Sequence, residues 1–336
     1  MVAPVHGGDI KNAMARAREF GFEAGDLSSW MDLSTGINPR PYPIPQLDPS
    51  LWHALPNQDL HEKLIDTAVK YYQVPSAENI LAASGSALLI QLLPNLFEGQ
   101  AVSIVSPTYG DHAAAWQRNT RSCSLIGSAD GHDEGILVLT NPNNPDGRKY
   151  TADELQALAE KQTRAGSWLI VDEAFADLGD GEKPTAALVD EFNIIVLKSI
   201  GKFFGLAGVR LGFMVAPPTI INTMTKQLGS WPVSGPALEI GFQALSNVAW
   251  QNETQAFLKT QTEAVLATFK QAQLPIIGGT DLFTLVDQSA KPALFKELLR
   301  AKIYVRSFDY NVDWLRVGLP ANDEELARLK LAVTSL

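Results

Sequence analysis

Short apolar runs alternate with longer amphipathic segments through the middle of the chain. Residues 59–72 carry Leu60, Leu64, Ala68 and Tyr71 at the three- and four-residue spacing of a helix with one buried face. Five short apolar runs follow, separated by segments long enough for helices: 80–83, 101–105, 136–140, 168–171 and 194–197. Because strands that alternate with helices form parallel sheets, this pattern predicts a mostly parallel sheet of the α/β class.

The two ends of the chain have different patterns. The first 45 residues are rich in Gly, Pro and polar residues, which predicts an extended arm with turns. Beyond Pro217-Pro218 we expect a helix-rich stretch and then a smaller α+β lobe, with these candidates: helices over about 219–273, 291–301 and 322–334, and strands at 283–286, 303–305 and 315–317. We therefore predict an arm (1–45), a large domain (46–220), and a helix-rich connection with a small C-terminal domain (221–336).

Composition and charge exclude several classes of protein. Hydrophobic residues make up 46% of the 336 and charged residues 19%, which suits a folded protein with a sizeable core. The net charge of −10 argues against a nucleic-acid partner, and no apolar run approaches the roughly 18 residues that span a bilayer. Cys123 is the single cysteine, and the N-terminus lacks a secretory pattern, so we expect a cytoplasmic protein. The five His residues lack ligand spacing, so no metal site is expected.

Polar clusters follow three of the predicted strands, where an open α/β sheet places its ligand. Ser84-Gly85-Ser86 opens a predicted helix and offers backbone donors to a phosphate, although an ordinary helix cap would look the same. Residues 141–147 contain Asn144 in a Pro-rich turn, which is either a rigid structural turn or a way to present an amide. Asp172 follows the next strand and would suit a metal, a base or a cationic cofactor.

A lysine lies among Gly and aromatic residues in the segment 198–212. Lys202 precedes Phe203-Phe204-Gly205, and Arg210 follows eight positions later. An apolar setting lowers the pKa of a lysine enough for Schiff-base chemistry, whereas an isolated lysine is usually a solvated surface residue.

Taken in order, these motifs resemble the class I/II aminotransferase family, whose members have the fold-type I fold and bind pyridoxal 5′-phosphate (PLP). The resemblance implies that Lys202 carries the cofactor and moves protons and that Asp172 pairs with the pyridine nitrogen. It implies that Asn144 donates to the phenolic oxygen and that Tyr109, in Pro107-Thr108-Tyr109, stacks on the ring. The remaining implied cofactor residues are Ser84, Gly85, Ser86, Phe175, Ser199 and Arg210, most of them at the phosphate.

The N-terminal arm indicates the substrate. His6-Gly7-Gly8-Asp9 and the segment 32–39 resemble the branch of the family that decarboxylates L-threonine O-3-phosphate, a step of cobalamin biosynthesis. This resemblance implies that Arg306 lies nearer the substrate phosphate and that Arg316, in Leu315-Arg316-Val317-Gly318, lies nearer the carboxylate. Two arginines suit a substrate with two anionic groups. The full implied substrate set is His6, Ser34, Thr35, Gly36, Asn144, Arg306 and Arg316.

Two alternatives and two departures accompany this resemblance. The main alternative is an aminotransferase acting on histidinol phosphate, and the second is a non-catalytic protein with the same fold. Phe175 stands where many aminotransferases of the family have a Tyr that donates to the cofactor, and Phe cannot donate. Leu55 stands where the family often has a Tyr that reaches the neighbouring subunit's cofactor, so one inter-subunit contact of the homodimer implied by the family is missing.

Overall fold

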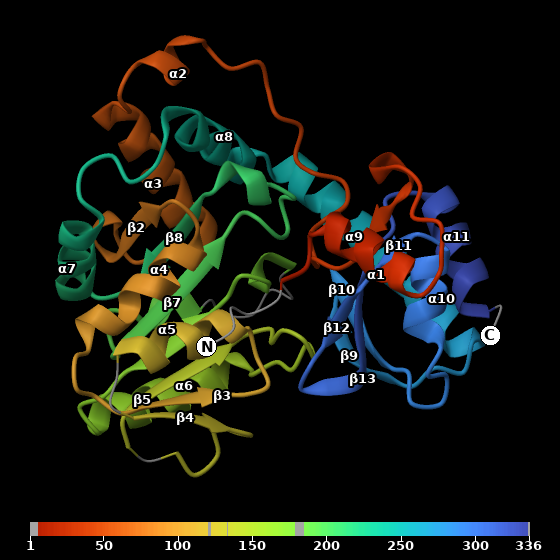
Figure 1. The fold of residues 1–336 in the computed structure, drawn as a ribbon. Coiled ribbons are helices and arrows are strands. Elements are labelled where there is room, and N and C mark those ends of the chain that lie inside the picture. The colour runs from red at the N-terminus through yellow and green to blue at the C-terminus, as the bar shows by residue number, and fades with distance from the viewer. Residues whose placement is uncertain (1–5, 120–121, 133, 179–184, 335–336) are drawn as a thin grey trace. The chain divides into compact units, whose positions relative to one another are not determined.

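A computed structural model of the chain describes residues 6–119, 122–132, 134–178 and 185–334. As far as they are described, these residues form two compact units (Figure 1). The sheet unit comprises Pro41–Asn144 and Lys149–Gln251, and the terminal unit comprises Met1–Arg40, Pro145–Arg148 and Asn252–Leu336.

A seven-stranded sheet forms the centre of the sheet unit. Its strand order is β2-β8-β7-β6-β5-β3-β4, and β8 alone runs antiparallel to its neighbours, so the prediction of a mostly parallel α/β sheet is confirmed. The strands are β2 (Ile80–Ala83), β3 (Val102–Val105), β4 (Cys123–Ile126), β5 (Ile136–Thr140), β6 (Leu169–Asp172), β7 (Ile194–Ser199) and β8 (Gly212–Val215). The sequence missed β4 because it is an edge strand with a half-exposed pattern instead of an apolar run.

Apolar side chains of alternate strand positions pack against helices on one face of this sheet. Leu81, Val138 and Leu197 belong to one buried cluster with Leu89 of α4 and Trp116 of α5. Figure 1 shows α4 and α5 beside the strands of this sheet. The helices of the unit are α2 (Ser50–His53), α3 (Gln58–Tyr72), α4 (Ser86–Leu92), α5 (Gly110–Asn119), α6 (Ala152–Arg164), α7 (Pro218–Leu228) and α8 (Gly235–Ser246). The core therefore fixes the strand ends, which carry the polar clusters predicted from the sequence.

The terminal unit is built on antiparallel strands with helices packed on them. Its four-stranded sheet has the order β12-β13-β10-β9, and the short strands β1 and β11 pair in parallel. The strands are β1 (Met31–Asp32), β9 (Ile276–Thr280), β10 (Phe283–Asp287), β11 (Ile303–Tyr304), β12 (Arg306–Phe308) and β13 (Asn311–Gly318). The helices are α1 (Ile10–Glu19), α9 (Val248–Gln271), α10 (Leu294–Arg300) and α11 (Asp323–Thr334), of which α9 crosses the boundary between the units in sequence.

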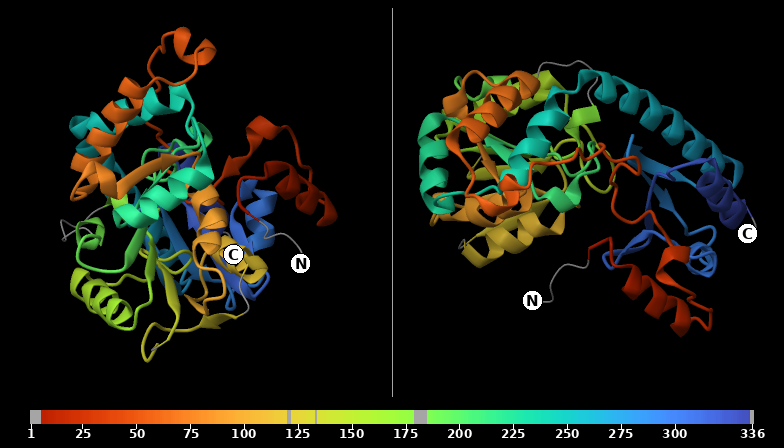
Figure 2. Two further views of the ribbon diagram at one scale, coloured as in Figure 1. Left: turned by 90° about the vertical axis from the view of Figure 1, so that its left-hand side faces the viewer. Right: turned by 90° about the horizontal axis from the view of Figure 1, so that it is seen from above.

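The expectation of an extended N-terminal arm is wrong for residues 10–19, which form helix α1. Asp9 caps this helix by accepting a hydrogen bond from the Asn12 backbone (3.1 Å), and Ala13 and Ala17 are fully buried one turn apart. Figures 1 and 2 show α1, in red, beside α10, in blue, and the two helices are in contact. The small buried residues concealed this helix, because two alanines give little apolar signal in the sequence.

The predicted division at residues 45 and 220 stays a prediction. In the structure residues up to Arg40 belong with the C-terminal part of the chain, and helices α7 and α8 belong to the sheet unit. Among the described residues, no helix is long and apolar enough to cross a membrane.

Candidate active site

The predicted phosphate residues converge where three strands of the sheet unit meet. Ala83 at the end of β2 and Ser199 at the end of β7 are both paired with Gly212 of β8. A Cβ atom on Gly212 would lie 2.4 Å from the backbone nitrogen of Ser86. Glycine at this position therefore lets the segment after β2 approach the strand that follows Arg210.

Arg210 lies directly against this segment. Gly85 has φ +88°, and a Cβ atom there would be 2.7 Å from Nη2 of Arg210. Arg210 itself is exposed, in the left-handed region at φ 55°, and its Nη1 donates to the Ala207 carbonyl (3.0 Å). A guanidinium beside a side-chain-free backbone suits a phosphate group, so the arrangement fits the cofactor implied by the sequence.

Two of the serines of this region, Ser84 and Ser199, have different surroundings. Ser84 is exposed and its hydroxyl donates to the Pro232 carbonyl (2.5 Å), which occupies its proton. Ser199 is buried, and its hydroxyl accepts from the Gly201 backbone (3.2 Å), which leaves its proton to donate.

Asp172 is a buried carboxylate at the end of β6. It is 3% exposed; its Oδ1 accepts from the Ala174 backbone (3.0 Å) and its Oδ2 lies 2.9 Å from Nε2 of His112. His112 lies on α5 and is completely buried. Because an ionised carboxylate is costly to bury without partners, these contacts hold Asp172 in one orientation, ready for a cationic ring nitrogen.

His112 is a site residue that the sequence prediction missed. Its contact with Asp172 joins residues 60 positions apart in sequence, which no local pattern reveals. The available signal was its place three residues after Tyr109, in the first turn of the helix that begins at Gly110. Among the described residues, no group of three or more His, Cys, Asp or Glu side chains could hold a metal ion.

Tyr109 directly precedes helix α5, which carries His112. Its hydroxyl donates to Oδ2 of Asp111 (2.7 Å), and its ring meets that of His112 edge to face, with centroids 6.2 Å apart. Burial and the neighbouring Asp111 raise the pKa of Tyr109 well above its usual value, and the charges of Asp172 and Arg210 also act on it. The phenol therefore stays neutral, and its ring is held in place from both ends.

Lys202 follows β7 and lies over an aromatic ring. Its Nζ is 5.3 Å from the ring centroid of Phe175, which is buried. The next two residues, Phe203 and Phe204, are buried and contact Trp250 with ring centroids 5.7 Å apart, Phe203 edge to face and Phe204 stacked. These aromatic contacts anchor the segment that carries the lysine.

Asn144 belongs to the loop after β5 and is half buried. The loop is fixed by its neighbour: Asn143 accepts from the Thr108 hydroxyl (2.7 Å) and donates to the Pro107 carbonyl (2.9 Å). Hydrogen bonds therefore join the predicted motifs at 107–109 and 141–147.

All the predicted substrate residues except Asn144 lie in the terminal unit. Ser34 is fully buried; its hydroxyl accepts from the Gly8 backbone (2.8 Å), and a Cβ on Gly7 would lie 2.4 Å from the Ser34 carbonyl oxygen. A Cβ on Gly8 would lie 3.4 Å from Cγ2 of Thr35. The Gly-Gly pair therefore lets the chain that carries His6 pack directly on the 34–36 turn, where Gly36 has φ +61°.

Two arginines of this unit stand opposite one another. Arg306 of β12 and Arg316 of β13 are paired in the antiparallel ladder, and Nη2 of Arg316 donates to the Ser34 carbonyl (2.7 Å). Arg316 is 6% exposed, and burial and then the charge of Arg306 lower its pKa to about 10. Like charges directly opposite in a sheet are unfavourable, so this pair is suited to an anionic ligand.

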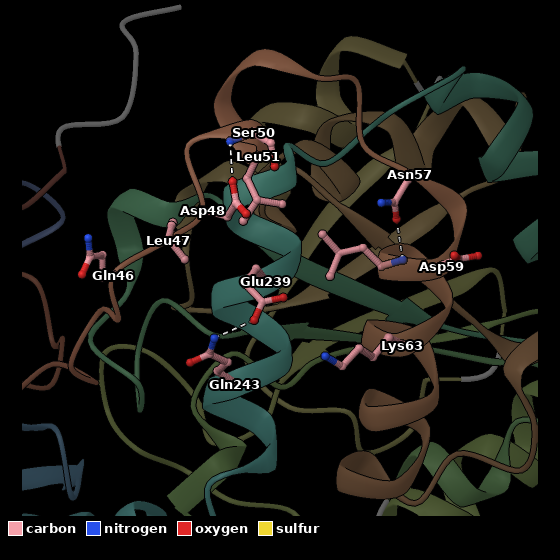
Figure 3. Close-up of a pocket in the computed structure, with 11 residues that line it drawn as sticks. Gln46, Leu47, Asp48, Ser50, Leu51, Asn57, Asp59, Lys63, Glu239 and Gln243 are labelled. Atoms are coloured by element: carbon pink, nitrogen blue, oxygen red, sulfur yellow. Dashed lines mark hydrogen bonds between the residues drawn. The ribbon is translucent and has the colours of Figure 1, made fainter.

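The sheet unit also has a surface pocket of about 390 Å³ between α2, α3 and α8 (Figure 3). Its polar groups hydrogen-bond within the wall: Asp48 accepts from the Ser50 backbone (2.8 Å), Asn57 from the Leu60 backbone (2.8 Å), and Gln243 donates to Glu239 (2.6 Å). None of the predicted site residues lines it.

Comparison with known proteins places the chain in a family. Two relatives named threonine-phosphate decarboxylase are 39% identical (Sinorhizobium sp., 97% of this chain and 98% of the relative) and 36% identical (Pseudomonas aeruginosa, 98% and 96%). The crystal structure of L-threonine-O-3-phosphate decarboxylase from Porphyromonas gingivalis has a TM-score of 0.72 with this chain at 18% identity, covering 85% of it and 94% of that protein, and this likeness confirms the fold. The family model described as aminotransferase class I and II matches residues 29–332, and the chain therefore belongs to that family.

Proposed function

We infer that the chain is a PLP-dependent decarboxylase of L-threonine O-3-phosphate, forming (R)-1-amino-2-propanol O-2-phosphate for cobalamin biosynthesis. The observation that carries the inference is the pair Arg306 and Arg316, opposite one another on neighbouring strands of a chain with a net charge of −10. A substrate with both a carboxylate and a phosphate supplies the two anions that such a pair needs. The names of the relatives at 39% and 36% identity support the same reaction.

Bound PLP supplies an electron sink for the pair of electrons left at the α-carbon when one of its bonds breaks. In this proposal Asp172, held by His112, keeps a proton on the ring nitrogen, and Tyr109 fixes the plane of the ring. Asn144 donates to the phenolic oxygen. The phosphate is held by Gly85, Ser86, Ser199 and Arg210, with Ser84 shaping the turn.

The remaining steps fall to Lys202 and the arginines. Arg306 holds the substrate phosphate and Arg316 the carboxylate, with His6, Ser34, Thr35 and Gly36 enclosing the ligand. The bond that stands perpendicular to the ring plane is the one that breaks, so selection of the carboxylate is a matter of positioning. After carbon dioxide leaves, the Nζ of Lys202 delivers a proton to the α-carbon.

Phe175 favours decarboxylation over the histidinol-phosphate aminotransferase alternative. Its ring is buried next to Lys202 and has no hydroxyl to donate to the phenolic oxygen. The second alternative, a non-catalytic protein, is opposed by the contacts that hold Asp172, because a scaffold has no use for a buried, oriented carboxylate.

We also propose that the protein is a homodimer, and a cytoplasmic location stays a prediction from the sequence. The sheet unit exposes Trp52 (68%), Leu55 (66%) and Trp231 (58%). These positions are connected: Ser84 bonds to Pro232 next to Trp231, and a Cβ on Gly235 would lie 2.7 Å from the Leu51 carbonyl oxygen next to Trp52. A second copy of the chain would cover this apolar surface beside the phosphate residues.

The reaction is tested with purified protein supplied with PLP. We expect it to release carbon dioxide from L-threonine O-3-phosphate, and we expect Lys202→Ala to lose at least about 10³-fold in kcat because both cofactor attachment and proton transfer fail. Amino transfer from histidinol phosphate to 2-oxoglutarate, with no carbon dioxide from threonine phosphate, would show that the assignment is wrong.

Arg306→Ala tests the anion site. It should raise the Kd for threonine phosphate by about 30-fold or more while changing the Kd for PLP by less than about twofold, since a charge-paired contact is worth about 2 kcal/mol or more. Calorimetric titration of each ligand measures both constants. Arg300→Ala, an exposed arginine paired with Glu297 on α10, is the control. If the substitution raised the Kd of threonine phosphate and the Kd of PLP equally, Arg306 would not be a specific part of the substrate site.

His112→Gln and His112→Phe separate the hydrogen bond from the packing. The Gln side chain can still donate to Asp172, so we expect it to keep kcat within about tenfold, whereas Phe should lower kcat by about 10²-fold and weaken PLP binding. Turnover and PLP titration of both variants measure this. Identical behaviour of the two variants would remove the orienting role from the hydrogen bond.

The dimer is tested by the molar mass in solution. The wild-type protein should sediment as a dimer, and Trp52→Lys combined with Trp231→Lys should sediment as a monomer, because two charges would have to be buried in the interface. Leu125→Lys, on the edge strand β4, is the control and should remain dimeric. A monomeric wild-type protein would contradict the proposal.

A further inference from the structure

A buried ion pair joins the ends of two central strands in the sheet unit. Lys198, near the end of β7, donates from Nζ to Oε2 of Glu173, which directly follows β6. The two side chains are 7% and 5% exposed. The backbone nitrogen of Glu173 also donates to the Leu197 carbonyl (2.9 Å), so β6 and β7 are tied together at this level through both backbone and side chains.

Three further polar side chains, Asp177, Tyr71 and Tyr72, lie near this pair. Asp177 hydrogen-bonds with Tyr71 of α3, and the Nζ of Lys198 lies 5.1 Å from the ring centroid of Tyr72. Burial, opposed by the charge of Lys198 and reinforced by that of Glu173, raises the pKa of Asp177 to about 7. Below neutral pH Asp177 is therefore mostly uncharged, and Lys198 faces one charged carboxylate.

None of these side chains has a role in the proposed reaction, but their neighbours in sequence do. Asp172 directly precedes Glu173, and Lys202 follows Lys198 by four residues. Successive side chains of a strand point to opposite faces, so Glu173 projects away from the side of Asp172. An effect of the pair on the site would therefore pass through the ends of the two strands.

A buried ion pair is a poor way to stabilise a fold. Desolvation of two charges offsets most of their attraction, and replacement of both by apolar residues is often neutral or stabilising. An ion pair is directional, whereas a hydrophobic contact is not. A catalytic site needs its reacting groups held to within about 0.5 Å of their working positions.

We propose that Glu173 and Lys198 are positioning residues whose ion pair fixes the ends of β6 and β7, and with them the spacing between Asp172 and Lys202. The inference rests on the proposed PLP site but not on the identity of the substrate.

The test separates site geometry from fold stability. Glu173→Met and Lys198→Met should each lower the Tm, because each leaves one buried charge without its partner. The double variant E173M/K198M should recover most of the Tm. Its kcat should nevertheless stay at least about tenfold below that of the wild type with KM changed less than about twofold, and the pH midpoint of the visible absorbance of bound PLP should stay shifted.

The control is a more exposed ion pair on α10, in which the side chain of Arg300 is 57% exposed and that of Glu297 22%. The variant E297M/R300M should match the wild type in Tm, kcat and absorbance. A double variant E173M/K198M with wild-type kcat and wild-type absorbance would overturn the proposal. A wild-type protein that shows no PLP absorbance would instead remove the proposed cofactor site, so the two failures are distinguishable.

Conservative variants keep the test decisive if the Met variants do not fold. Lys198→Arg and Glu173→Asp retain both charges but change the length of the pair. We expect a Tm close to that of the wild type and a shifted absorbance midpoint. A midpoint unchanged in both variants would overturn the proposal.

The pH dependence of the Tm tests separately whether Asp177 is uncharged below neutral pH. The pKa of Asp177 is about 7 in the folded protein, against a usual value of 3.8. As the pH rises, the unfolded chain therefore loses this proton before the folded protein does. The contribution of Asp177 to stability then falls between about pH 4 and about pH 7. Asp177→Asn should abolish that part of the pH dependence of the Tm. Asp177 faces Lys198, Glu173, Tyr71 and Tyr72. If the pH dependence of the Tm were the same in Asp177→Asn as in the wild type, Asp177 would be charged over this pH range. Lys198 would then face two charged carboxylates, Asp177 and Glu173, which contradicts a single ion pair with Glu173.

Discussion

The buried carboxylate of Asp172 is the constraint on which the sheet unit depends. A charge that is 3% exposed persists only if the surrounding structure supplies hydrogen bonds, and here they come from the Ala174 backbone and from His112. His112 can reach Asp172 because the apolar cluster of the sheet packs α5 against the strands. The core therefore does more than stabilise the unit, since it also orients the group that the cofactor ring would meet.

The terminal unit presents the opposite electrostatic problem. Arg306 and Arg316 are held opposite one another by the ladder between β12 and β13, and Arg316 is further fixed by the Ser34 carbonyl. The sheet register thus stores an unfavourable contact between like charges that an anion would relieve. The same Ser34 accepts from Gly8, so the N-terminal segment and the arginine strand share one anchoring residue.

The two units divide the chemistry between them in this proposal. The sheet unit carries the residues that would bind PLP, and these are common to reactions of many kinds. The terminal unit carries the residues that would distinguish one substrate from another. Phe175 is the exception, because it lies beside Lys202 and still bears on the reaction through the hydroxyl that it lacks. The residues that would bind the cofactor therefore do not by themselves specify the substrate.

The sequence by itself determined the α/β class of the sheet, five of its seven strands and the polar clusters at their ends, because apolar runs and turn residues are local signals. It also pointed to the family through motifs such as the segment around Lys202. It did not reveal helix α1, whose buried face is made of alanines, or the contact of His112 with Asp172. Nor did it reveal the ion pair of Glu173 with Lys198 or the pairing of Arg306 with Arg316. These contacts have no local signal in the sequence, and only the packing of the helices and the register of the strands decided which side chains would meet.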